Sequence, residues 1–258
     1  MRCMKTAKIL MLIQARVSST RLPGKVLLPF YKGESILELI LKRLRGELAE
    51  IPIMLATSDQ PADDAIVRCC ERLEVPVFRG DETDVLKRFI DATAGTAFEG
   101  VIRICCDNPF LLTAPVKTLL TQAEQNGAAD YISFRDSHFT PAIKTHWGLF
   151  AEYVKIKALV EASRRTNDPL YREHVTNFIY GHPEHFQVKL IPAPAEIIDR
   201  NDLRFTVDTP EDFEVARQLF QLLGGRNMGF KLKELVLLVD ANPDLKVKMQ
   251  SGIQNFKK

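Results

Sequence analysis

The first half of the chain alternates between short, continuous apolar runs and longer segments in which apolar positions recur with a helical period. The continuous runs predict strands at 7–14, 51–58, 75–78, 100–106 and 130–134. The periodic segments predict helices at 35–48, 61–73, 84–95 and 114–127. Strands that are apolar throughout are typical of a parallel sheet covered by helices on both faces. We therefore expect an α/β fold with a mostly parallel sheet flanked by helices.

The pattern changes after Phe134. Residues 135–150 have no clean period, and they are followed by predicted helices at 151–165 and 169–182 and a predicted strand at 186–193. A strand, a turn at 208–210 and a helix are predicted within 203–223, with a short basic tail after them. No internal repeat or low-complexity linker is present. We expect one domain over 1–258, in which residues 135–190 project as a substrate-binding or dimerisation segment.

Composition excludes several classes of function. Lys and Arg number 35 and Asp and Glu 33, so the formal net charge is +2, and the molecule as a whole has no strong attraction for nucleic acid or for an anionic membrane. We expect neither partner. The chain begins with basic residues and a short apolar run. The run has the length of a strand, and no small-residue cleavage site of a signal peptide follows it, which favours a cytoplasmic protein. The five cysteines, Cys3 and two adjacent pairs at 69–70 and 105–106, lack metal-ligand spacing and are expected to be buried free thiols.

Polar stretches of unusual composition follow the predicted strands at 15–25, 57–64, 79–84, 107–110 and 208–212. In an open α/β sheet, ligands bind in the crevice at the carboxyl ends of the strands. The sequence therefore predicts that these stretches converge on one edge of the sheet.

The stretch after the first strand combines Arg16, Ser19, Arg21 and Lys25 with a Pro-Gly bend. On charge alone it could be a solvated basic turn. Fixed cations, a hydroxyl and free backbone N–H groups in one short span are also the components of a polyphosphate-binding loop. Neither a GxxxxGK[ST] nor a GxGxxG motif is present, so phosphate binding here requires a different design.

The stretch "IQARVSSTRLPGKVL" resembles the signature of the sugar cytidylyltransferases, the family that includes the CMP-Kdo and CMP-sialic acid synthetases. Among them it is most similar to the spore coat polysaccharide biosynthesis protein F branch. The similarity continues in "VFRGDETDVLKRF", "VIRICCDNPFL", "YREHVTNFIYGHPEHF" and "LRFTVDTPEDFEVA", and so spans about residues 8–220. It implies a nucleotide-diphospho-sugar transferase-like fold, with CTP and a sugar as substrates.

The resemblance also implies a reaction, in which a sugar hydroxyl attacks the α-phosphate of CTP with Mg²⁺ assistance and gives a CMP-sugar and pyrophosphate. Triphosphate binding is then assigned to the cations and hydroxyl of the first loop, with Arg21, Lys25 and Asp107 catalytic. Asp107 and Asp208 would bind the magnesium, because a hard cation takes carboxylate and phosphate oxygens. From local pattern alone, Asp107 could instead be a turn residue and Asp208 a helix N-cap.

The same resemblance assigns the nucleotide's base and ribose to Ser58, Asp59 and Arg79, although Ser-Asp before Pro is also a common helix start. Arg88 either completes this pocket or is a solvated helix residue.

Candidates for the acceptor sugar are Glu152, Arg172 and His174. Arg172 could bind the carboxylate of an ulosonic acid. The cluster at 172–174 is equally consistent with a salt-bridged helix start or a dimer surface.

Two positions depart from the family branch. Cys106 replaces a glycine just before the metal-binding Asp, and Phe150 replaces an acidic residue. These changes leave open a binder of nucleotide-sugars without turnover. A glycosyltransferase of similar fold is a second alternative, because nucleotide-sugar synthesis and sugar transfer share nucleotide-binding α/β scaffolds, although no DxD motif follows a strand here.

The segment 135–190 also prompts a prediction about assembly. It carries Phe139, Trp147, Phe150 and Tyr153, more aromatic residues than a peripheral segment needs for its own packing. We therefore predict a homodimer built mainly from this segment.

Overall fold

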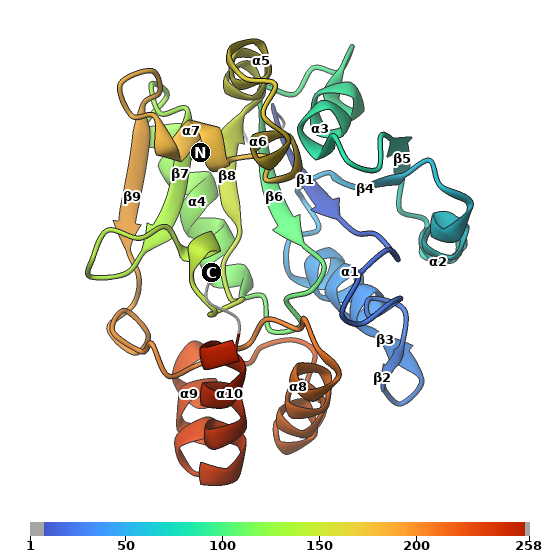
Figure 1. The fold of residues 1–258 in the computed structure, drawn as a ribbon, viewed down its shortest axis with the longest axis vertical. Helices are drawn as coiled ribbons and strands as arrows, with labels where there is room; N and C mark the ends of the chain where they lie inside the picture. The colour runs from blue at the N-terminus through green and yellow to red at the C-terminus, as the bar shows by residue number, and fades with distance from the viewer. Residues whose placement is uncertain (1–7, 256–258) are drawn as a thin grey trace.

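The apolar runs of the first half form the centre of a seven-stranded sheet with the order β5-β4-β1-β6-β8-β7-β9 (Figure 1). The computed structural model describes residues 8–255. The strands of this sheet are β1 (Ile9–Gln14), β4 (Ile53–Ser58), β5 (Val77–Gly80), β6 (Gly100–Cys105), β7 (Tyr131–Arg135), β8 (Glu152–Lys155) and β9 (Val188–Pro192). Only β8 runs antiparallel to its neighbours. The predicted mostly parallel sheet is confirmed.

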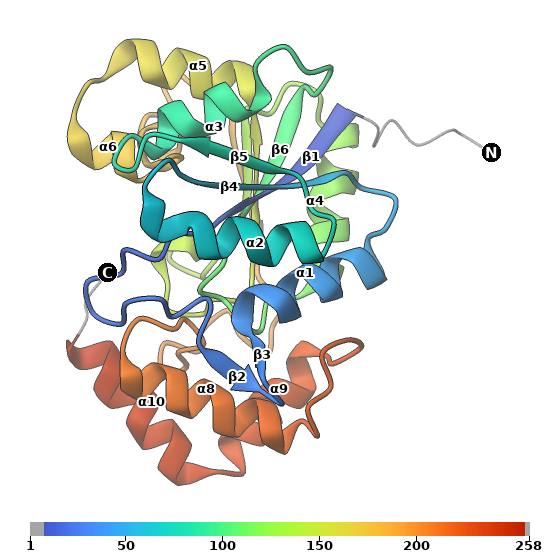
Figure 2. The same cartoon turned by 90° about the vertical axis from the view of Figure 1, so that its right-hand side faces the viewer.

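Helices cover both faces of the sheet, because successive side chains of each strand point to opposite faces. In β1, Met11 and Ile13 join the core under α1, α2 and α4, whereas Leu10 and Leu12 join the core under α3, α5 and α7. Figure 2 shows α1 and α2 on one side of the sheet and α3 and α5 on the other. The helices are α1 (Ile36–Glu47), α2 (Asp64–Arg72), α3 (Val85–Thr93), α4 (Thr113–Gln125), α5 (Ile156–Arg165), α6 (Pro169–Glu173), α7 (Asn177–Gly181), α8 (Pro210–Leu222), α9 (Leu232–Asp240) and α10 (Pro243–Asn255).

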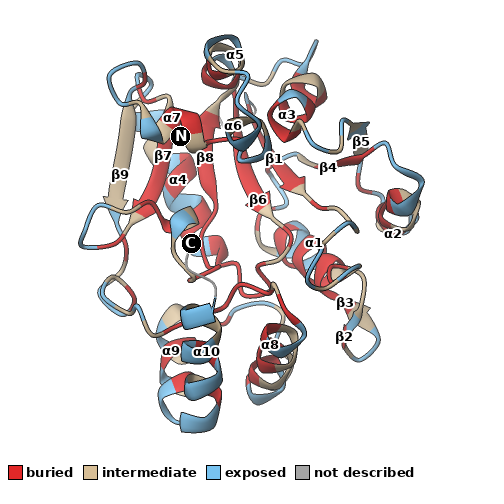
Figure 3. Cartoon of the chain, viewed as in Figure 1, coloured by how far each residue is buried: buried red, intermediate tan, exposed pale blue. Residues whose placement is uncertain are grey.

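The register of β1 against β6 sets the position of the loops that follow them. Ile9 pairs with Gly100 and Gln14 pairs with Cys105, so the two parallel strands end at the same level. Their central residues are buried (Figure 3). The loops beginning at Ala15 and Cys106 therefore emerge side by side at one edge of the sheet.

Several predicted elements of the second half are wrong. The helix expected at 151–165 begins only at Ile156, because Glu152–Lys155 forms β8 between β6 and β7, so part of the segment expected to project lies within the sheet. The helix expected at 169–182 is divided into α6 and α7. No strand forms at 203–208, where the N–H groups of Phe205 and Val207 donate to the loop carbonyls of His146 and Asp107.

The expected basic tail also differs from the structure. It contains α9 and α10, which pack beside α8 through buried Leu235, Val239, Leu245 and Met249. A small hairpin of β2 (Pro29–Tyr31) and β3 (Glu34–Ser35) also contacts α8. Within residues 8–255, no helix combines the length and apolar character required to cross a membrane.

The aromatic residues of the middle segment mostly serve the interior. Trp147, Phe150 and Tyr153 are buried, and only Phe139 of the four is exposed. The aromatic argument for a dimer is therefore reduced to Phe139, and the homodimer stays a prediction.

The cysteines of the described residues are free. Cys69, Cys70 and Cys106 are buried and Cys105 is partly exposed. Cys3 lies outside the described residues.

Candidate functional site

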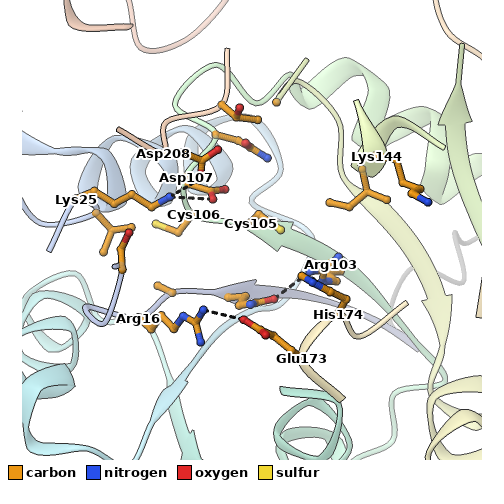
Figure 4. Close-up of a pocket in the computed structure, with 18 of the residues that line it drawn as sticks. Arg16, Lys25, Arg103, Cys105, Cys106, Asp107, Lys144, Glu173, His174 and Asp208 are labelled. Carbon is orange, nitrogen blue, oxygen red and sulfur yellow. Dashed lines mark hydrogen bonds and ion pairs between the residues drawn. The ribbon is translucent and has the colours of Figure 1, made fainter. Parts of the chain in front are cut away.

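A cavity of about 740 Å³ opens where β1 and β6 end. Its walls come from the loop after β1, the segment 105–108 after β6, the segment 142–150, the helices α6 and α7, and residues 204–208 before α8. Figure 4 shows Lys25, Asp107 and Asp208 at one end, Arg103 and His174 at the other, and Arg16 with Glu173 along one side. Of the predicted polar stretches, those after β4 and β5 do not line this cavity.

Lys25 joins the two carboxylates predicted to bind metal. Its ammonium is 3.1 Å from Asp107 Oδ2 and 3.3 Å from Asp208 Oδ1, and it donates to the carbonyl of Val207 at 2.5 Å. Burial by itself would lower the pKa of Lys25, but the two carboxylates outweigh burial, and the pKa lies above its ordinary value. Lys25 is therefore a fixed cation between two anions.

Asp208 also faces two guanidinium groups. Arg21 approaches its Oδ1 at 3.0 Å, and Arg204 binds its Oδ2 at 2.8 Å. Arg204 is in turn held by Asp212 at 2.7 Å. Arg204 was not among the residues predicted from the sequence. The only signal for it in the sequence is its position in "LRFTVDTPED", four residues before Asp208.

The cap that begins α8 leaves Asp208 free to face the cavity. Thr209 is the N-cap residue, its side chain accepting from the N–H of Asp212, while the Asp212 carboxylate accepts from the N–H of Thr209. This capping box provides acceptors for the backbone N–H groups at the start of the helix without the Asp208 side chain. Asp208 is therefore not the N-cap that its sequence context also suggested.

The loop after β1 is held by a buried carboxylate that the sequence analysis did not single out. Asp63 accepts from the N–H of Val17 at 2.7 Å and from the Thr57 hydroxyl at 2.9 Å. Gly24, with φ +69°, makes the bend that returns the chain toward Lys25. Arg16, Ser19, Arg21 and Lys25 all line the cavity as a result.

Arg16 is paired across the cavity. Its guanidinium lies 3.0 Å from Glu173 at the end of α6. Both side chains are partly exposed, so the pair is accessible to a ligand that enters from solvent.

The predicted base-recognising residues lie outside the cavity lining. The Ser58 hydroxyl donates to the buried Asp63 carboxylate, and Asp59 is exposed. Arg79 is paired with Asp64 at 2.7 Å. Their role in binding the nucleotide stays a prediction. Arg88 is fully buried and donates to the Asp81 carbonyl, so it is not a solvated helix residue.

The three predicted acceptor-binding residues have different surroundings. His174 lines the cavity and is exposed. Glu152 lies beneath the cavity wall, 2.6 Å from Arg103. Arg172 is not part of the lining, and its guanidinium bonds to Ser163 and Asn167 and pairs with Asp84.

The two positions that depart from the family branch both line the cavity. Cys106 belongs to the buried core, and burial raises the pKa of its thiol well above the ordinary value, so the thiol stays neutral. Phe150 packs against Phe134 and Trp147, with ring centroids 4.8 and 5.8 Å apart. Both side chains are thus part of the wall, and neither supplies charge.

The donor set fits a divalent cation that also binds phosphate. Among residues 8–255, no three His, Cys, Asp or Glu side chains gather in an arrangement that could hold a metal ion by themselves. Asp107 and Asp208 nevertheless converge on one point, which the Lys25 ammonium marks as a cation position. Magnesium is commonly bound by one or two carboxylates together with substrate phosphates. These two residues are sufficient for that mode.

Comparison with known proteins identifies the family. The sequence matches the cytidylyltransferase family over residues 10–238. The chain belongs to this family. It is 34% identical over 241 residues to the spore coat polysaccharide biosynthesis protein SpsF of Bacillus subtilis, a match that covers 92% of this chain and 95% of that protein.

Solved structures of cytidylyltransferases share the fold. The structure of a cytidylyltransferase from Leptospira borgpetersenii is 25% identical, with a TM-score of 0.78 over 94% of this chain and 97% of that one. A CMP:2-keto-3-deoxy-manno-octonic acid synthetase in complex with CTP is 16% identical, with a TM-score of 0.62 over 84% of this chain and 99% of that one. The predicted family and fold are both confirmed.

Proposed function

We propose that this cytidylyltransferase transfers CMP from CTP to a sugar hydroxyl, with release of pyrophosphate, in the biosynthesis of a surface polysaccharide or glycan. The observation that carries the proposal is the convergence of Lys25, Asp107 and Asp208 in a cavity that Arg16 and Arg21 also line. The similarity to SpsF supports a role in polysaccharide synthesis, and the CTP bound to the octonic acid synthetase supports CTP as the donor. We place the reaction in the cytoplasm, where CTP is available.

The proposed reaction exchanges a phosphoanhydride bond of CTP for a phosphate ester bond to the sugar. The sugar oxygen forms a bond to the α-phosphorus, the bond from that phosphorus to the oxygen bridging the β-phosphorus breaks, and pyrophosphate leaves with that bridging oxygen. The hydroxyl proton passes to solvent. Arg16, Arg21 and Lys25 would exchange their present carboxylate partners for phosphate oxygens and hold the triphosphate in place.

We further propose that Asp107 and Asp208 hold a magnesium ion when CTP binds. A bound magnesium supplies charge neutralisation at the reacting phosphate and lowers the pKa of a coordinated hydroxyl. The contribution of the chain itself is to fix two carboxylates at one end of the cavity, with Lys25 between them, and to deliver the triphosphate to that end.

The test compares nucleotides on the full chain. CTP with Mg²⁺ should raise the melting temperature more than ATP, GTP or UTP, because a ligand that binds only the native state stabilises it. Pyrophosphate release should require CTP and a sugar. The Arg21→Ala and Lys25→Ala variants should lose most of the CTP-induced shift while remaining folded, whereas Arg217→Ala, on the outer surface of α8, should keep it. Equal shifts with all four nucleotides would contradict the proposal.

A further inference from the structure

At the end of the cavity remote from Lys25, where Figure 4 shows Arg103, α7 presents uncharged polar groups, because Thr176, just before this helix, donates to the Glu152 that pairs with Arg103. Asn177 and Tyr180 are three residues apart, so they share one face of the helix, and both line the cavity. Within residues 8–255, neither the Asn177 amide nor the Tyr180 hydroxyl is engaged in a side-chain hydrogen bond. Both groups can donate and accept hydrogen bonds. They are available to a ligand.

A neutralised arginine lies beside these groups. Arg103 lines the cavity, and its guanidinium is 2.6 Å from Glu152 and 3.2 Å from the Gln14 side-chain oxygen. The two charged side chains are only 7% and 3% exposed, so solvent does little to screen the pair. Glu152 is held further by the hydroxyls of Tyr131 and Thr176. The net charge of this buried group is zero.

The remaining cations of the cavity belong to its other end or to its rim. Lys25, Arg21 and Arg204 are all paired with Asp208 at the phosphate end. Arg16 is partly exposed and paired with Glu173, and Lys144 is exposed, so solvent screens its charge; the His174 imidazole is exposed as well. Figure 4 shows Arg103 and His174 toward the end of the cavity away from Asp208. No unmatched buried cation faces the remote end among the described residues.

We propose that Asn177, Tyr180 and the Arg103–Glu152 pair form the acceptor subsite, and that it selects an uncharged, hydroxyl-bearing sugar over a sugar acid. The inference rests on the proposed function and specifies its acceptor. Amide, phenol and guanidinium groups match the donors and acceptors of sugar hydroxyls. A carboxylate placed here would lose its hydration without gaining an unmatched positive charge. In this scheme Glu152 is a positioning residue, since it acts through Arg103.

The acceptor class is tested with matched pairs of sugars on the full chain. Pyrophosphate release with CTP and Mg²⁺ is measured for neutral aldoses, for the corresponding uronic acids, in which a carboxylate replaces the terminal CH₂OH group, and for an ulosonic acid. We expect kcat/KM for the preferred neutral sugar to exceed that of its acid by at least about tenfold. The melting temperature with CTP is measured in parallel.

Two conservative variants test the subsite itself. Asn177→Ala and Tyr180→Phe should each raise the KM for the sugar by about three- to tenfold, the effect of one neutral hydrogen bond, and leave the CTP-induced shift unchanged. Tyr171→Phe is the matched control, because Tyr171 lies on α6 and outside the cavity lining. Glu152→Gln leaves the Arg103 charge unmatched and should shift the ratio of acid to neutral turnover toward the acid by about tenfold. If Glu152→Gln does not fold, the Asn177→Ala and Tyr180→Phe variants still test whether α7 binds the sugar.

Several outcomes would overturn the inference. One is an acid that is used as well as its neutral partner, and another is a pair of α7 variants with no larger effect on the sugar KM than Tyr171→Phe. A panel in which no neutral sugar either turns over or further stabilises the CTP complex would overturn it as well. A protein that CTP stabilises no more than ATP would instead refute the proposed function.

Discussion

Replacing each cavity carboxylate by its amide should separate the chemistry of the site from its stability. Asp208 is 13% exposed and faces Arg21, Lys25 and Arg204 at 3.0, 3.3 and 2.8 Å. Asp107 is 32% exposed and, among the charged groups of residues 8–255, contacts only Lys25, at 3.1 Å. Both amides keep the size of the acid but remove the negative charge.

The two variants should differ in stability. Hydrogen bonds to charged groups contribute about 1.5–3 kcal/mol each, and Arg204 keeps Asp212 as a partner, so Asp208→Asn should cost about 2–3 kcal/mol. Asp107→Asn removes one ion pair whose carboxylate is partly exposed, and Lys25 keeps Asp208 as a partner, so it should cost less than about 1 kcal/mol. For a chain of this size, these values correspond to losses of about 4–12 °C and less than about 4 °C in melting temperature.

Turnover should fall in both variants. If both carboxylates hold one magnesium, each should lose a factor of about 10² or more in pyrophosphate release and require more magnesium, because transition-state charge is less well stabilised. The assay is pyrophosphate release against magnesium concentration, with thermal melting of the same samples and Asp240→Asn, outside the cavity, as control. Normal rates at ordinary magnesium would refute the shared-metal mechanism. An Asp107 variant less stable than the Asp208 variant would refute the account of the ion pairs.

Three further predictions follow from single contacts. Glu173→Gln should tighten CTP binding by up to about fivefold in calorimetry, because an exposed pair such as Arg16–Glu173 contributes at most about 1 kcal/mol and must open for a phosphate. Weaker CTP binding in this variant would contradict the exchange of Glu173 for phosphate. Gly148→Ala should lower stability in urea unfolding by more than about 1 kcal/mol, because φ is +57° and a Cβ would lie 2.8 Å from a backbone nitrogen; an unchanged midpoint would contradict this. Hydrogen bonds from Arg200 lower the pKa of Asp202 from 3.8 to about 2, so the ionised carboxylate stabilises the fold fully above pH 4, and this stabilisation is lost as pH falls toward 2. The difference in free energy of unfolding between wild type and Asp202→Asn should therefore shrink from pH 6 to pH 3. A constant difference would refute the assignment.

The sequence alone determined the elements whose stability is local or whose burial is complete. The runs that became β1, β4 and β6 are mostly apolar and do not alternate between apolar and polar positions, which is typical of strands covered on both faces. Because the polar stretches follow these strands directly, Lys25 and Asp107 could be assigned to one edge before any contact was known. The order of the motifs along the chain then indicated the family.

Tertiary structure decided the elements whose partners are distant in sequence. The run beginning at Glu152 has side chains compatible with a helix, and it becomes a strand because β6 and β7 leave a position between them that satisfies its backbone. The chain at 203–207 has strand-like composition, yet its N–H groups bond to loops, which places Arg204 and Asp208 in the cavity.

The same reasoning accounts for the site residues. Arg172 and Arg103 are both arginines next to recognisable motifs, and nothing local separates them. In the folded structure, Arg172 pairs with Asp84, whereas Arg103 lines the cavity and pairs with the buried Glu152. Side-chain direction and charge compensation depend on contacts between segments far apart in the chain, so only the folded structure could decide them.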